Sequence, residues 1–182
     1  MKYEKYFKNY NKSIYDLLID FDTSLIDKSA DLILECKKNN GKIFIAGNGG
    51  SSSIASHVSV DFSKVANVPS DTFNNANLIT CFANDYGHDN WIKEAIRAYT
   101  KKNDMLILIS SSGKSKNIVN AAKYCKENKI PLITLSGFDI NNPLAKMGDV
   151  NIHINSNKYN FIEMSHHIIL VSIVDIFAEN IF

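Results

Sequence analysis

Residues 42–53 of the chain are KIFIAGNGGSSS, an apolar run that passes directly into a cluster of glycine and serine. The apolar part, residues 42–46, has the length and composition of a buried strand. Glycines in the cluster let the backbone approach an anion closely, and the free N–H groups of a following helix favour negative charge. The stretch therefore predicts a strand, a ligand-binding loop and a helix that begins immediately after the loop.

Similar units follow this one along the chain. Further strands are predicted at 78–82, 105–109, 131–135 and 149–154. A pair of helices is predicted over 10–38, with a break near Asp22. Single helices are predicted over 117–128 and from about 161 to the end. The alternation predicts an α/β fold of one domain, 1–182: a five-stranded parallel sheet with helices on both faces, in flavodoxin-like or Rossmann-like order. The helices at about 1–38 are expected to pack in an oligomer.

The strand predicted at 105–109 ends in a second polar loop, Ser110-Ser111-Ser112-Gly113-Lys114-Ser115. It supplies four hydroxyls, several backbone amides and one cation at the carboxyl end of a strand, where open α/β sheets bind ligands. A plain turn with a serine helix cap is the alternative for one such loop. Two such loops favour phosphate binding. Neither loop has the P-loop or the dinucleotide-binding pattern, so nucleotide hydrolysis and a dinucleotide cofactor are not expected.

Bulk composition narrows the class of protein further. The 182 residues carry a formal net charge of +1, which gives no general attraction to nucleic acid or to a membrane surface. Three scattered cysteines have no metal-type spacing, and no signal peptide or apolar run of membrane-spanning length is apparent. A cytoplasmic protein is therefore expected, with no direct nucleic-acid or membrane partner.

The two loops, together with Ala83-Asn84-Asp85-Tyr86-Gly87 and the helix that holds His57, resemble the sugar isomerase (SIS) domain family. Within it they look like the phosphoheptose isomerase branch. The resemblance implies interconversion of sedoheptulose 7-phosphate and a heptose 7-phosphate for surface polysaccharide (lipopolysaccharide or capsule) precursors. It also implies a homotetramer with active sites between subunits. The matched substrate-binding positions are Asn48, Gly49, Gly50, Ser51, Asn84, Asp85, Ser110, Ser111, Ser112, Ser115 and Glu163.

The resemblance also implies a divalent metal, usually zinc, and here the sequence departs from the family pattern. His57 is kept, but Asp61 stands in place of the catalytic glutamate, Glu163 in place of a glutamine, and Val171 in place of the second catalytic histidine. His57 with Asp61 and Glu163 with His167 are each one helical turn apart, and carboxylates with imidazoles are suitable zinc ligands. His57, Asp61, Glu163 and His167 are therefore the expected metal ligands. Asp61 is the expected base and His167 the second proton carrier or a ligand.

Three functions are compatible with these residues. The first is an aldose–ketose isomerase of phosphoheptose type, and the second is a related isomerase acting on another sugar phosphate. The third is a non-catalytic SIS module that binds a phosphosugar or a protein partner, which the replacement by Val171 favours. In that third case His167 and its neighbour His166 only cap a helix or line a helix contact. The substrate loops favour ligand binding in all three.

Overall fold

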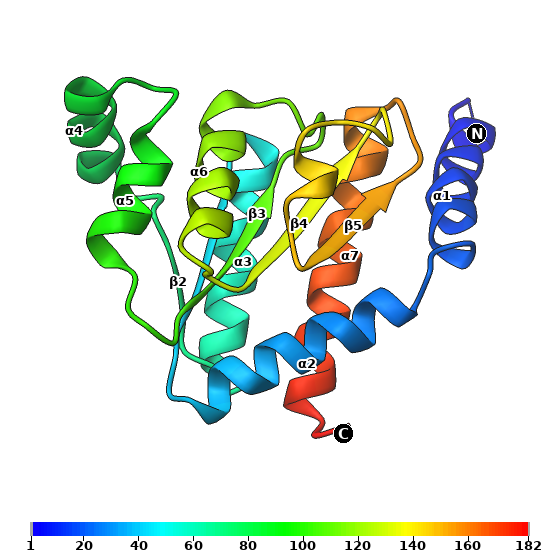
Figure 1. Ribbon diagram of the computed structural model, residues 1–182. Coiled ribbons are helices and arrows are strands. Elements are labelled where there is room, and N and C mark those ends of the chain that lie inside the picture. The colour runs from blue at the N-terminus through cyan, green and yellow to red at the C-terminus, as the bar shows by residue number, and fades with distance from the viewer. Residues whose placement is uncertain (1, 182) are drawn as a thin grey trace.

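Five parallel strands form the centre of the structure, a computed structural model that describes residues 2–181 (Figure 1). Their order is β2-β1-β3-β4-β5, which is the flavodoxin-like order expected from the alternating pattern. The bounds are β1 (Ile43–Gly47), β2 (Ser70–Thr72), β3 (Met105–Ile109), β4 (Leu132–Gly137) and β5 (Val150–Ile154). Because all pairs are parallel, the polar loops after β1 and β3 emerge at the same edge of the sheet.

Helices cover both faces of this sheet, as predicted (Figure 1). On one face lie α2 (Ser24–Lys38), α3 (Gly50–Lys64) and α7 (Tyr159–Ala178). On the other lie α5 (Trp91–Tyr99) and α6 (Lys116–Glu127), with a short 3₁₀ turn at Leu144–Lys146. Strand β3 is fully buried between the layers: Met105, Ile107 and Ile109 face the first, and its two leucines face the second. Such burial explains why its sequence is an unbroken apolar run.

The strand predicted at 78–82 is wrong, because these residues lie inside helix α4 (Ala76–Tyr86). Asn75 caps this helix, since its side-chain oxygen accepts hydrogen bonds from the backbone N–H groups of Asn77 and Leu78. The second strand of the sheet is instead the short edge strand β2, which is polar. An apolar run of five residues suits a buried strand or one face of a helix, and here the cap selects the helix.

The N-terminal pair of helices is divided as predicted, with α1 (Glu4–Ile19) followed by α2. Helix α1 lies at the periphery in Figure 1, and none of its residues is buried. Its ring contact with the core layer is made by Tyr10, which packs edge-on against Phe161 of α7 with ring centroids 4.8 Å apart. Tyr6, Phe7 and Tyr15 of α1 are each more than 60% exposed.

Helix α7 is apolar on more than one side. By length and composition alone it could cross a membrane, although half of that stretch is buried within the protein. Polar residues such as Glu163, His167 and Asp175 interrupt the helix, so it contains no unbroken apolar run of that length. The buried residues include Ile162, Ile169 and Leu170, which pack in the same core layer as β3. The helix thus has the position of a core helix, and its hydropathy reflects that packing.

Candidate functional site

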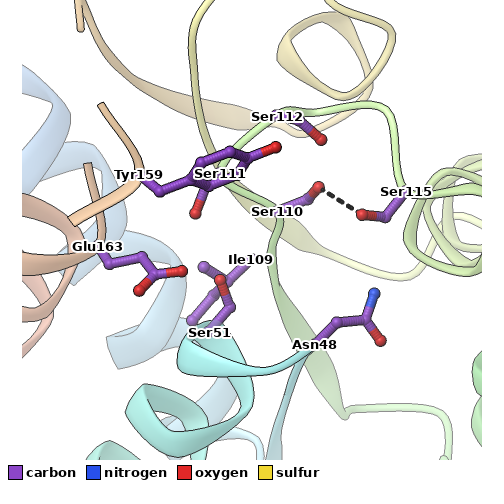
Figure 2. A pocket seen from close by; sticks show the side chains of 9 residues that line it. All are labelled: Asn48, Ser51, Ile109, Ser110, Ser111, Ser112, Ser115, Tyr159 and Glu163. Atoms are coloured by element: carbon purple, nitrogen blue, oxygen red, sulfur yellow. Dashed lines mark hydrogen bonds between the residues drawn. The ribbon is translucent and has the colours of Figure 1, made fainter. Parts of the chain in front are cut away.

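A polar cavity of about 160 Å³ opens where the chain leaves β1 and β3 (Figure 2). These strands are neighbours from which the sheet grows in opposite directions, and ligands of open α/β sheets bind at such a switch point. The first loop contributes Asn48 and Ser51, and α7 contributes Tyr159 and Glu163. The remaining lining residues are Ile109, Ser110, Ser111, Ser112 and Ser115. A cavity of this size suits a phosphate group better than a whole sugar phosphate.

The serine loop leaves hydrogen-bonding groups available to a ligand. Ser110 Oγ donates to Ser115 Oγ at 3.1 Å, so the two hydroxyls hold each other beside the cavity. Within the described chain, the Ser115 side chain makes no capping hydrogen bond to α6, although Ser115 occupies the N-cap position. The buried Ser111 hydroxyl likewise has no partner among residues 2–181. Unpaired donors at the start of a helix are what an anion requires.

Gly113 gives this loop its shape. Its φ is +63°, a conformation that residues with a side chain rarely adopt, and a Cβ atom there would overlap the side-chain amide of Asn142. Asn142 is fully buried, and its Nδ2 donates to Ser136 Oγ and to the backbone oxygens of Gly137 and Asp139. The loop after β4 therefore supports the serine loop from behind.

Glu163 lies against the first loop. A Cβ atom on Gly50 would meet its carboxylate, so the glycine makes room for Glu163 at the N-terminus of α3. A carboxylate is favourable there because the helix dipole is positive at this end. Glu163 thus occupies the anion-binding position of the first loop, and the serine loop is the more open place for a phosphate.

Further along α3 and α7, three titratable side chains are linked in a row by hydrogen bonds: Asp61, His57 and His167. His57 Nε2 lies 3.0 Å from Asp61 Oδ2, and His57 Nδ1 lies 2.7 Å from His167 Nε2. His57 follows Ser51 by six residues on α3, roughly 9 Å along the helix, and His167 follows Glu163 by one turn on α7. When both rings are neutral, His57 donates to Asp61 and accepts from His167, which leaves Nδ1 of His167 as the free acceptor.

Burial lowers the pKa of His167, and the neighbouring His57 lowers it further, while Asp61 acts in the opposite direction. His167 is therefore held in its neutral form near pH 7, the form that accepts a proton. His166, the next residue, instead faces the sheet: it is fully buried, and its Nε2 lies 3.0 Å from the backbone oxygen of Ser136. Val171, the position at which the resemblance implies a histidine, packs against the core.

These side chains do not fit the expected zinc site. Among residues 2–181, no group of three or more His, Cys, Asp or Glu side chains is arranged to hold a metal ion. Both ring nitrogens of His57 are engaged by Asp61 and His167, so neither is free for an ion. Glu163, the fourth expected ligand, lies at Gly50 and in the cavity wall. The arrangement is that of a hydrogen-bonded relay.

The expected substrate-binding residues separate into two groups. Seven of them line the cavity, and Gly49 and Gly50 shape the turn into α3, with Gly49 at a φ of +54°. Asn84 and Asp85 do not line it; they lie on α4, where Asn84 Nδ2 donates to Asp85 Oδ1 at 2.9 Å. Their contact with substrate stays a prediction, and an active site between subunits would allow it.

Tyr159 is a cavity residue that the sequence analysis did not identify. It precedes Glu163 by four residues, so the two share one face of α7. That spacing was the available signal, since Glu163 had already been placed in the site.

The comparisons with known proteins agree with this geometry. The SIS domain family matches residues 5–137. A phosphoheptose isomerase from Colwellia psychrerythraea is 32% identical over 166 residues, covering 86% of this chain and 84% of that relative. A phosphoheptose isomerase 2 from Campylobacter jejuni is 35% identical over 130 residues, covering 66% of this chain and 64% of that relative.

Solved structures show the same likeness. The structure of phosphoheptose isomerase GmhA from Neisseria gonorrhoeae superposes with a TM-score of 0.86 at 25% identity, covering 97% of this chain and 99% of that one. A phosphoheptose isomerase from Francisella tularensis has the same fold, with a TM-score of 0.85 over 98% of this chain and 97% of that one, at 24% identity. Cavity, fold and sequence agree that this chain belongs to the SIS domain family, among relatives that are phosphoheptose isomerases.

Proposed function

We propose that the protein is a sugar-phosphate aldose–ketose isomerase that interconverts sedoheptulose 7-phosphate and a heptose 7-phosphate. The observation that carries this proposal is the pairing of an anion-binding serine loop with the Asp61–His57–His167 chain on the adjoining helices. A seven-carbon sugar phosphate has its reacting carbons at the end opposite its phosphate. An extended substrate suits this arrangement, because His57 lies roughly 9 Å along α3 from Ser51 of the cavity wall.

The reaction moves one proton between adjacent carbons and another between their oxygens, through an enediol. A base takes the proton from the carbon beside the carbonyl while an acid gives one to the carbonyl oxygen, which forms the enediol. The hydroxyl on the first carbon then loses its proton as the former carbonyl carbon gains one, which forms the product. In our proposal the free nitrogen of His167 and the His57 ring carry these protons, and Asp61 stabilises the positive charge that develops on the pair. Asp61 as the direct base stays the alternative within this scheme.

His167 would therefore replace the histidine that the family has at Val171. It lies one helical turn earlier on α7 and contacts His57 directly. Because the side chains do not fit a metal as arranged, no step of the proposed mechanism uses one.

Assembly into a homotetramer is part of the proposal. The side chain of His57 is 53% exposed, and the apolar Val60, Met164 and Ile168 on the same two helices are 58, 40 and 44% exposed. A neighbouring subunit would cover these groups and exclude water from the reacting carbons. Helices α1 and α2 would take part, and Asn84 and Asp85 would reach the sugar of a neighbouring site. Light scattering should give a tetramer, and a monomer at micromolar concentration would contradict it.

The setting would be the cytoplasm, with surface-polysaccharide precursors as the pathway. The test is incubation of the purified protein with sedoheptulose 7-phosphate in D₂O, followed by NMR. We expect an aldose phosphate that carries deuterium at C2. If the sugar phosphate binds but neither aldose nor deuterium exchange appears, the protein is a non-catalytic SIS module.

A further inference from the structure

We infer that Asn117, a buried residue of α6 outside the cavity wall, is a positioning residue that fixes which atom of the Asn48 amide faces the ligand. The inference rests on the proposed function, because the ligand is taken to be a sugar phosphate. Asn48 lines the cavity, whereas Asn117 is 1% exposed and lies two residues after Ser115.

The two amides form a reciprocal pair. Asn48 Nδ2 donates to Asn117 Oδ1 at 2.9 Å, and Asn117 Nδ2 donates to Asn48 Oδ1 at 2.9 Å. The pair joins the loop after β1 to the helix that follows the serine loop, although the residues are 69 positions apart. It therefore couples the two halves of the cavity.

A reciprocal pair alone does not set direction, because both amides could rotate by half a turn and bond equally well. Here the backbone sets it. The N–H of Ile118 donates to Asn117 Oδ1 at 3.0 Å, and a backbone N–H can only donate. Oδ1 of Asn117 must therefore stay where it is, and Asn48 must turn its Nδ2 toward it.

The pairing uses one N–H and one lone pair of Asn48. One N–H and one lone pair remain, and their directions are set by Asn117. Figure 2 shows the Asn48 amide on the Ser115 side of the cavity, where a phosphate oxygen or a sugar hydroxyl would accept or donate. An unpaired asparagine would present its oxygen and its nitrogen interchangeably, and an oxygen facing a phosphate would repel it.

A double-mutant cycle tests the inference, with sedoheptulose 7-phosphate affinity measured by calorimetry. Asn48→Ala and Asn117→Ala should each weaken binding about tenfold. The double variant should bind no more weakly than Asn48→Ala, because Asn117 acts only through Asn48. Additive losses would overturn the inference and leave Asn117 as a merely structural residue. Asn128→Ala, at the other end of α6, is the matched control and should bind as the wild type does.

A second variant covers the case in which Asn117→Ala does not fold. Asn117→Asp keeps the shape, but its carboxylate cannot donate to Asn48 Oδ1. At pH 8 this variant should bind the sugar phosphate more weakly than the wild type does. The difference should shrink at low pH, because the protonated carboxyl can again donate a hydrogen bond to Asn48 Oδ1. A ratio that does not change with pH would overturn the inference.

NMR of the protein without ligand separates this inference from the proposed function. The side-chain amide signals of Asn48 should shift in Asn117→Ala and stay in place in Asn128→Ala. If wild type binds no sugar phosphate while these signals shift, the proposed function fails and the pair stands. If the signals do not shift, the pair itself is refuted.

Discussion

Nδ1 of His57 and Nε2 of His167 lie 2.7 Å apart, although the two residues are separated by 110 positions in the chain. The rings meet nearly at right angles, with an interplanar angle of 89°. Asp61 holds the opposite nitrogen of His57, so the contact fixes the tautomer of both rings.

Replacing His167 should stop the reaction without unfolding the protein. We expect His167→Ala to lower kcat by about 100-fold or more, because a proton carrier is lost. KM should change little, since His167 does not line the phosphate cavity. His88→Ala, at an exposed histidine of the chain, is the matched control. An unchanged kcat in the NMR assay would show that the pair carries no protons.

Chelation tests the absence of a metal from this mechanism. Because both nitrogens of His57 are already engaged, we expect dialysis against EDTA to leave the isomerase rate unchanged. A rate that falls and returns on addition of zinc would show that the side chains rearrange around an ion, and the relay would then be wrong.

Ser111→Ala should affect stability and binding in opposite directions. A buried hydroxyl without a partner among the described residues destabilises the free protein, so its removal should leave the free energy of unfolding unchanged or raise it by about 1 kcal/mol. Affinity for inorganic phosphate should fall, because the cavity loses a donor. Urea unfolding and calorimetry measure the two effects. A loss of stability with no loss of affinity would remove Ser111 from the site.

The sequence predicted those elements whose formation depends on residues that are close together in the chain. Strand β3 was predictable because five buried residues stand between turn signals, and the serine loop follows it directly. Helix α4 was not, because the same apolar run suits a strand and the deciding cap at Asn75 is a side-chain hydrogen bond. The His57–His167 contact depends on how α3 and α7 pack, so spacing within each helix suggested the residues but not their pairing. For the same reason no pattern indicated Asn117.

Gly113→Ala should destabilise the serine loop far more than a comparable change elsewhere. The substitution combines a positive φ with overlap on Asn142, and we expect a loss of about 3 kcal/mol or more. Gly87→Ala is the matched control: its φ of +78° and ψ of 152° also favour glycine, but no atom lies within 4 Å of the added Cβ, so a loss of about 1 to 3 kcal/mol from the backbone alone is expected. Urea unfolding compares the two. Equal losses would show that Asn142 does not support the loop.

His166 should make the protein less stable in acid. Burial lowers its pKa to about 4, against the opposing effect of its hydrogen bond to Ser136, and His153 of β5 lowers it further. The folded protein therefore keeps this ring neutral while the unfolded chain takes up a proton near the ordinary value of 6.5. The contribution to stability is complete above pH 6.5 and is lost as the pH falls toward 4, at about 1.4 kcal/mol per pH unit.

Between pH 6.5 and 5 the wild type should thus lose about 2 kcal/mol more than His166→Gln, whose side chain does not titrate. Only the change with pH is compared, because the substitution alters the core as well. Urea unfolding at the two pH values gives the difference, and His88→Gln should follow the wild type because that histidine is exposed. Equal slopes for wild type and His166→Gln would mean that His166 can take up a proton in the folded protein, which its closed position between α7 and β4 argues against.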